Sequence, residues 1–289
     1  MDSLNLDRIS KTAIIVNQLK AEHYLEGAYP KIYSDPISAQ LAKLFAGEPI
    51  LKAYHSLSSD LIKGAQSSVL LRSRYVCDQF KEAIDSGKGC DQLIILGSGF
   101  DCLAYQARPE YQGVQFFELD RWNILSTKET LLDQCLYPKP PNLQFCPVDF
   151  KTDDIYQLLL SHHYKADKVA LATLLGVTQY IEAETFDCIL KAILQCKPGS
   201  KLILSYIVTP EILDEKEAKL LAEFEQIASA SGEPFVAHYH PESLVQKLKD
   251  MGFSFVQRFT PKEAQENYFY NRIDGLYANS VEQAIKLTV

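Results

Sequence analysis

A short glycine motif is the first feature of the sequence that could support chemistry. The apolar run 92–96 is followed by Gly97, Ser98 and Gly99, and a helix is predicted to begin near Asp101. Glycine allows a backbone with positive φ to approach a ligand closely, and a helix start offers free N–H groups to a carboxylate or phosphate. Because a lone G-x-G turn is equally common in ordinary loops, the residues that follow decide between the two interpretations.

Carboxylates lie where the next two predicted strands end. Glu118 and Asp120 close the second strand, about 20 residues after the glycine turn, where a carboxylate can accept hydrogen bonds from ribose hydroxyls. Asp149 ends the third strand and could accept the amine of an adenine, with Phe150 beside the ring. Each carboxylate alone is more often a helix cap or a solvated charge. Their repetition at successive strand ends favours a nucleoside site.

Cys102 separates two kinds of nucleotide site. A dinucleotide-binding turn carries a third glycine at this position, where it packs the helix under a pyrophosphate. The cysteine therefore disfavours a nicotinamide-dependent oxidoreductase. A nucleoside without a pyrophosphate fits the pattern best.

Strand and helix patterns alternate after residue 90, which predicts the elements that position these residues. Continuous apolar runs are typical of strands buried on both faces of a parallel sheet, and right-handed crossovers place helices on either side. We therefore expect an α/β fold with a Rossmann-like, mostly parallel, seven-stranded sheet. The predicted strands occupy residues 92–97, 114–120, 143–149, 168–176, 200–206, 251–259 and 284–289.

The sequence before the first strand shows only helical patterns. Asp35 followed by Pro36 is typical of a helix start, since Asp caps the free N–H groups and proline suits the first turn. We expect a helical cap over residues 1–90 and a ligand-binding core over residues 91–289. Within the core, the segment around 207–245 is predicted to form a lid.

Composition excludes several classes of function. The net charge is −8, from 29 Lys and Arg against 37 Asp and Glu, which disfavours binding to nucleic acid. The seven cysteines lack zinc-binding spacing, so we expect no metal site. Neither a secretory signal nor an apolar run of membrane-spanning length is recognisable, so we expect a cytoplasmic protein without membrane association.

A series of short motifs resembles the leucine carboxyl methyltransferase family, in particular its bacterial branch of polyketide-type O-methyltransferases. The segment QLIILGSGFDCLAYQ, followed by FFELD, carries the resemblance in the middle of the chain. Further blocks occur in the family's order: SKTA (10–13), YSDP (33–36), LRSRYVCD (71–78), PVDF (147–150), LGVTQYI (175–181) and RIDGL (272–276). Several motifs in the correct order are more specific than any single one.

The resemblance implies S-adenosylmethionine as cofactor and S-adenosylhomocysteine as product. Lys11 and Arg72 would hold the methionine carboxylate, and Asp120 would bind the ribose, with Glu118 as the second candidate. The full set of residues assigned to the cofactor is Lys11, Arg72, Gly97, Ser98, Gly99, Glu118, Asp120, Asp149 and Phe150. One departure is Leu175, because many family members have a glutamate there, near the amino group of the cofactor.

The acceptor side of the reaction is less clearly marked. A hydroxyl acceptor needs a base within hydrogen-bond reach, whereas a carboxylate acceptor is already ionised. Tyr206, at the end of the fifth predicted strand, is the candidate catalytic residue because it matches a family tyrosine near the substrate. The residues predicted to contact the acceptor are Tyr180, Tyr206, His240 and Arg272.

Three functions are compatible with these residues. The first is an O-methyltransferase acting on a hydroxyl or carboxyl of a small molecule resembling a secondary metabolite. The second is a protein methyltransferase acting on a C-terminal carboxylate, and the third is a non-catalytic protein that binds S-adenosylmethionine. Binding of S-adenosylhomocysteine separates all three from the oxidoreductase, and methyl transfer separates the first two from the third.

Overall fold

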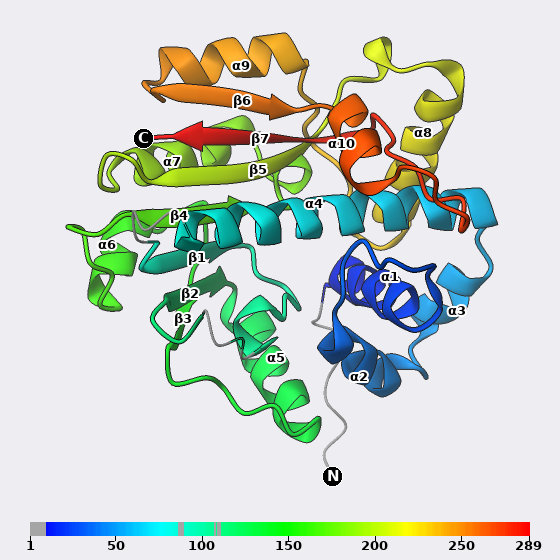
Figure 1. Cartoon of the computed structure of the whole chain (residues 1–289), viewed down its shortest axis with the longest axis horizontal. Helices are drawn as coiled ribbons and strands as arrows, with labels where there is room; N and C mark the ends of the chain where they lie inside the picture. The colour runs from blue at the N-terminus through cyan, green and yellow to red at the C-terminus, as the bar shows by residue number, and fades with distance from the viewer. Residues whose placement is uncertain (1–9, 86–89, 107, 109–110) are drawn as a thin grey trace.

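The computed structural model describes residues 10–85, 90–106, 108 and 111–289, and it is drawn in Figure 1. Four helices precede the sheet: α1 (Lys11–Glu26), α2 (Pro36–Phe45), α3 (Pro49–His55) and α4 (Ser59–Asp85). The later helices are α5 (Trp122–Gln134), α6 (Ile155–Ser161), α7 (Ala183–Leu194), α8 (Glu215–Ala230), α9 (Pro241–Asp250) and α10 (Pro261–Tyr268). Within these described residues, no helix is long and apolar enough to cross a membrane.

Seven strands form one sheet in the order β3-β2-β1-β4-β5-β7-β6. The first five are parallel, and β7 runs antiparallel to both of its neighbours. The predicted α/β class and the mostly parallel, seven-stranded sheet are thus confirmed. The strand bounds are β1 (Gln92–Leu96), β2 (Gln115–Asp120), β3 (Leu143–Pro147), β4 (Ala170–Leu174), β5 (Lys201–Ile207), β6 (Phe255–Phe259) and β7 (Glu282–Thr288).

Side chains of β1 alternate between two apolar layers, one on each face of the sheet. Leu93 and Ile95 belong to a core that includes residues of α4 and α5, whereas Ile94 and Leu96 belong to a core with α6, α7 and α9. This alternation follows from the two-residue period of a strand. Because both faces are covered, every residue of β1 is buried, as its continuous apolar run predicted.

The N-terminal helices share a core with the sheet. Val76 and Phe80 of α4 lie in the same apolar cluster as Leu93 and Phe116. In Figure 1, α4 extends across the sheet, with α1 and α8 near its N-terminal half. The described N-terminal helices are therefore continuous with the sheet, because α4 forms one of the layers that cover it.

The segment after the glycine turn differs from the prediction. Where an α-helix was expected near Asp101, the described residues form a 3-10 helix at Leu103–Gln106. The side chain of Asp101 accepts a hydrogen bond of 2.8 Å from the backbone N–H of Leu103. This contact tightens the chain after the turn, and it uses one of the donors that an α-helix start would leave free.

Candidate functional site

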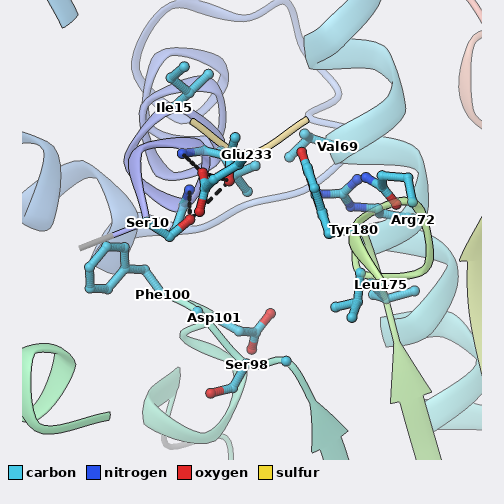
Figure 2. Close-up of a pocket in the computed structure, with 18 of the residues that line it drawn as sticks. Ser10, Ile15, Val69, Arg72, Ser98, Phe100, Asp101, Leu175, Tyr180 and Glu233 are labelled. Atoms are coloured by element: carbon cyan, nitrogen blue, oxygen red, sulfur yellow. Dashed lines mark hydrogen bonds between the residues drawn. The ribbon is translucent and has the colours of Figure 1, made fainter. Parts of the chain in front are cut away.

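A cavity of about 920 Å³ opens at the carboxyl ends of β1, β2, β3 and β4. Ligand sites in α/β sheets lie at this edge, and the volume is at the upper end of the range for ligand pockets. Helices α1, α4 and α8 and the segment 231–235 form the opposite walls. Figure 2 shows Arg72, Ser98, Tyr180 and Glu233 arranged around it.

The glycine turn forms the floor of the cavity. Gly97 and Gly99 have φ values of 71° and 48°, in the region that glycine occupies without strain. A Cβ atom on Gly97 would lie 2.4 Å from Cγ2 of Val177, so no larger residue fits there. The hydroxyl of Ser98 is buried and has no hydrogen-bond partner among the described residues. The turn therefore brings a bare backbone and a free hydroxyl to the cavity.

Two acidic residues of β2 occupy different environments. Asp120 lines the cavity, and its carboxylate accepts hydrogen bonds of 2.8 Å from the backbone N–H groups of Gly99 and Arg121. Burial raises the pKa of Asp120, while these two backbone donors act in the opposite direction. Each carboxylate oxygen can accept a second hydrogen bond, so Asp120 can still bind hydroxyl groups.

Glu118 is a structural residue in the core rather than a lining residue of the cavity. Its side chain is fully buried, and one carboxylate oxygen lies 2.5 Å from Nζ of Lys128, which is also fully buried. Burial raises the pKa of Glu118 to about 7, against the opposing effect of Lys128. Of the two predicted ribose-binding residues, Asp120 therefore lines the cavity and Glu118 does not.

Asp149 and Phe150 lie on the cavity wall where β3 ends. Asp149 is exposed, and its carboxylate accepts a hydrogen bond of 2.9 Å from the N–H of Lys151. The side chain of the next residue, Phe150, is half-buried. Both residues predicted for the adenine end of the site therefore line the same cavity.

Arg72 of α4 reaches the cavity and pairs with the carboxylate of Glu282, which was not among the predicted site residues. Its Nη1 atom lies 2.7 and 2.8 Å from the two carboxylate oxygens of Glu282 at the start of β7. Both side chains are largely buried and line the cavity. A Cβ on Gly176, whose φ is 66°, would lie 2.7 Å from the guanidinium. The glycine therefore makes room for Arg72.

Two lysines of α1 line the cavity in different ways. The predicted residue, Lys11, is exposed, whereas Lys20 is buried with its Nζ 3.6 Å from the carboxylate of Asp101. Burial lowers the pKa of Lys20, but the carboxylates of Asp101 and Asp35 outweigh this effect and raise the pKa above its usual value. Lys20 was missed because a lysine on a helix is usually solvated.

A hydrogen-bonded contact closes one side of the cavity. The backbone N–H and the hydroxyl of Thr12, in the first turn of α1, donate to one carboxylate oxygen of Glu233 over 3.0 and 2.7 Å. Both residues line the cavity, as Figure 2 shows for Glu233. This contact joins α1 to the segment after α8, which lies within the predicted lid.

The structure separates the residues that were predicted to contact the acceptor. Tyr180 lines the cavity, where burial raises its pKa to about 12. Tyr206 is fully buried in the core with α7 and α9, and its hydroxyl lies 3.1 Å from the side-chain oxygen of Gln283. The structure thus places Tyr206, the predicted catalytic residue, in the core and not on the cavity wall. His240 also lies outside the cavity, exposed at the start of α9.

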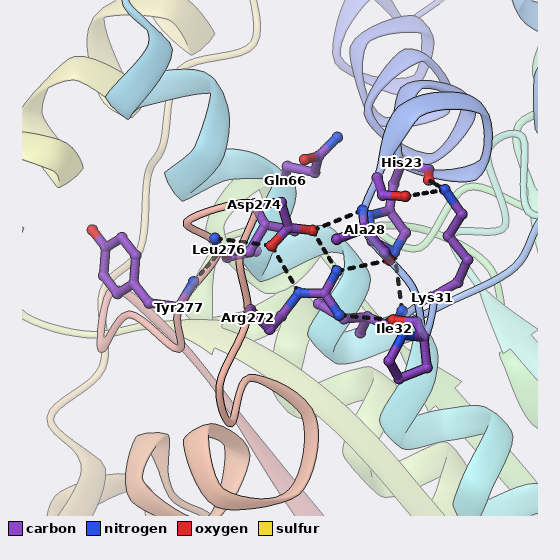
Figure 3. Close-up of polar contacts among 12 residues, drawn as sticks. His23, Ala28, Lys31, Ile32, Gln66, Arg272, Asp274, Leu276 and Tyr277 are labelled. Carbon is purple, nitrogen blue, oxygen red and sulfur yellow. Dashed lines mark hydrogen bonds and ion pairs between the residues drawn. The ribbon is translucent and has the colours of Figure 1, made fainter.

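Arg272 stabilises the fold at a distance from the cavity. Its guanidinium pairs with Asp274 and donates to the carbonyl oxygens of Ala28 and Pro30 over 3.1 and 2.8 Å, as Figure 3 shows. These contacts fix the loop after α1 against the segment that precedes β7. The structure thus places Arg272, which was predicted to contact the acceptor, outside the cavity lining and with its donors engaged elsewhere.

Comparison with known proteins connects the chain to one family. The family model described as leucine carboxyl methyltransferase matches residues 13–194, more than half of the chain. YktD of Bacillus subtilis, a proposed S-adenosylmethionine-dependent methyltransferase, is 26% identical over 191 residues. The match covers 66% of this chain and 62% of YktD, so the chain spans less than two thirds of that relative.

Solved structures show the same fold over nearly the whole chain. A proposed methyltransferase from Thermobifida fusca has a TM-score of 0.59 and 17% identity, with 99% of this chain and 96% of that one covered. A DUF574 family protein from Streptomyces avermitilis has a TM-score of 0.56 and 12% identity, with 99% of both chains covered. At these identities the similarity concerns the fold.

Proposed function

The chain belongs to the leucine carboxyl methyltransferase family of S-adenosylmethionine-dependent enzymes, and from this premise we propose that it methylates an oxygen of a small molecule. The methyl donor is S-adenosylmethionine, and the acceptor group is a hydroxyl or a carboxyl. The observation that carries the proposal is the convergence of three distant segments. The glycine turn, Asp120 and Arg72 all line the same cavity.

The residues in the cavity fit the cofactor. The buried hydroxyl of Ser98 lacks a partner among the described residues, and Gly97 has no room for a larger side chain. On this assignment Asp120 binds the ribose, Asp149 and Phe150 contact the adenine, and Arg72 holds the methionine carboxylate. The exposed Lys11 assists Arg72 through its charge. When bound, the sulfonium supplies a methyl group already activated for transfer, so the protein needs mainly to align the acceptor and exclude water.

A small acceptor suits the closure of the site. The contact between Thr12 and Glu233 joins α1 to the segment after α8, and these elements enclose the cavity from the side opposite the sheet. A cavity of about 920 Å³ has room for a nucleoside cofactor and a small second molecule. The net charge of −8 further disfavours a nucleic acid as acceptor.

Isothermal titration calorimetry with S-adenosylhomocysteine tests the proposal. We expect micromolar or tighter binding, and ligand at 100 times its dissociation constant should stabilise the fold by about 2.7 kcal/mol. NAD, which needs a pyrophosphate cradle, serves as the control and should bind much more weakly. The proposal fails if millimolar S-adenosylhomocysteine produces neither heat nor a change in melting temperature.

A further inference from the structure

The cavity has an apolar extension along α4, away from the strand ends. Leu61, Ala65, Val69 and Arg72 are spaced by four, four and three residues, so they share one face of the helix. From Leu61 to Val69 this face spans about 12 Å, at 1.5 Å per residue. The lining therefore changes from apolar to charged along a single helix, with the charged end facing the proposed cofactor site.

Helix α8 forms the second wall of this extension. Phe224 and Ile227 line the cavity and pack against an apolar cluster that includes Leu61 and Leu220. The two helices approach closely at Gly64, where a Cβ would lie 2.8 Å from methyl groups of Leu220. We define the apolar arm as the part of the cavity lined by Leu61, Ile62, Ala65, Val69, Phe224 and Ile227.

Polar groups lie beside the apolar arm. Tyr180 and Glu233 line the same cavity, and the ring of Tyr180 packs edge-on against Phe235, with centroids 5.3 Å apart. One carboxylate oxygen of Glu233 accepts both donors of Thr12, and the other has no hydrogen bond within the described residues. This second oxygen can accept a hydrogen bond from a hydroxyl group. A ligand carboxylate at this position would instead be repelled by the negative charge of Glu233.

We propose that the apolar arm binds the methyl acceptor, and that the acceptor is an uncharged, elongated, largely apolar molecule with a hydroxyl group directed toward Glu233. This inference rests on the proposed function, because it assigns the strand-end part of the cavity to the cofactor. The chemistry follows from the lining. An apolar body gains free energy from leaving water, whereas a charged group in the same place would lose hydration without a partner.

Binding of three simple probes to the protein saturated with S-adenosylhomocysteine tests the proposal by calorimetry. The probes are 1-octanol, 1-butanol with a shorter chain, and octanoate with a charged end. We expect 1-octanol to bind at least tenfold more tightly than either of the other two. Equal affinity for 1-octanol and 1-butanol would overturn the apolar arm as a binding site, and tighter binding of octanoate would overturn its preference for an uncharged ligand.

Substitutions locate the probe. Ala65→Phe places a ring in the apolar arm and should weaken 1-octanol binding at least tenfold, with the affinity for S-adenosylhomocysteine within twofold of wild type. Ala222→Phe makes the same change on an exposed position of α8 outside the cavity lining and should affect neither ligand. If Ala65→Phe does not fold, Ile227→Glu replaces it with the same expectation. A folded variant of either kind that still binds 1-octanol normally contradicts the proposal.

Glu233→Gln tests the preference for an uncharged ligand. The amide oxygen can still accept from Thr12, but the negative charge is gone, so octanoate should bind more tightly relative to 1-octanol. Unchanged discrimination between the two would show that Glu233 does not face the ligand. Failure of the proposed function is distinguishable, because it would appear as a loss of S-adenosylhomocysteine binding in the wild-type protein.

Discussion

The cavity joins two regions that are built in different ways. At the strand ends, backbone groups and short side chains form the surface, and Gly97 and Asp120 are held by the hydrogen bonds of the sheet edge. Toward α8, the surface consists of side chains from helices, joined to α1 by the contact between Thr12 and Glu233. The first region suits a ligand that does not vary among related enzymes, such as a cofactor. The second can change with the acceptor, because helix side chains can be replaced without altering the sheet.

The largest effect expected is on stability, at the buried ion pair behind the strand ends. Glu118→Ala leaves Lys128 fully buried without its partner and should destabilise the fold by about 3–5 kcal/mol in urea titration. Affinity for S-adenosylhomocysteine in the folded fraction should be unchanged. Glu129→Ala, which breaks a half-exposed pair with Lys139, is the control and should change stability by at most about 1 kcal/mol. Lost affinity in folded Glu118→Ala would place this residue in the cofactor site.

Arg72 connects the two regions, so its loss should have the largest effect on binding. Arg72→Ala should weaken S-adenosylhomocysteine binding by about 3 kcal/mol, since the methionine carboxylate loses its partner and Glu282 remains buried without a cation. Arg74→Ala removes the same side chain two residues along α4, where it pairs with Asp78 at the surface. Calorimetry should detect little change in that control. Equal losses in both variants would mean that α4 acts only through its packing.

Asp120 tests the strand-end region separately. Asp120→Ala should weaken binding of both S-adenosylhomocysteine and 5′-methylthioadenosine by about 2 kcal/mol, because both ligands carry the ribose that loses a charge-assisted acceptor. Binding of 1-octanol to the apolar arm should not change. If the affinity for 5′-methylthioadenosine is preserved in a folded variant, the ribose lies elsewhere.

Glu282 lines the cavity between the strand-end region and the helical region, since it belongs to neither the glycine turn nor the helices. Its substitution therefore tests where the cofactor site ends. Glu282 lies beside Arg72, so the two can face the carboxylate and the ammonium of a methionine moiety. Such a pairing would supply the carboxylate missing at Leu175. Glu282→Gln should reduce the preference for S-adenosylhomocysteine over 5′-methylthioadenosine about tenfold, or about 1.4 kcal/mol. Equal weakening of both ligands would instead indicate a general disturbance of the site.

The two regions also differed in how far the sequence predicted them. Gly97, Gly99 and Asp120 were identified because each follows directly from the end of an apolar run, and parallel strands bring their carboxyl ends to one edge. Glu233 and Glu282 were not predicted. Glu233 lies in a loop and Glu282 is the first residue of β7, and no motif in the surrounding sequence indicates that either lines the cavity. Their positions follow from chain contacts formed only in the folded protein.

Tyr206 shows why a strand-end position was not sufficient. Successive residues of a strand point to opposite faces, so a shift of one residue reverses the prediction. The hydroxyl of Ser205 accepts a hydrogen bond of 2.8 Å from the N–H of Gly176 beside the cavity, whereas Tyr206 points into the core with α7. The apolar run 200–206 is buried on both faces, so its hydrophobic pattern did not distinguish these two directions.

The smallest expected effect concerns the contact that joins α1 to the segment after α8. Thr12→Val keeps the shape of the side chain but removes the hydroxyl that donates to Glu233, a loss of about 1 kcal/mol for one hydrogen bond. If the first turn of α1 opens locally, its amides should exchange about fivefold faster with deuterium in the free protein.

The control is Thr130→Val, whose hydroxyl bonds within α5 and which should leave exchange in α1 unchanged. Saturation with S-adenosylhomocysteine should slow the exchange in α1, because Lys11 of this helix lines the cavity that the ligand then fills. Exchange that is equally slow in both variants would show that packing, and not this hydrogen bond, keeps the first turn of α1 in place.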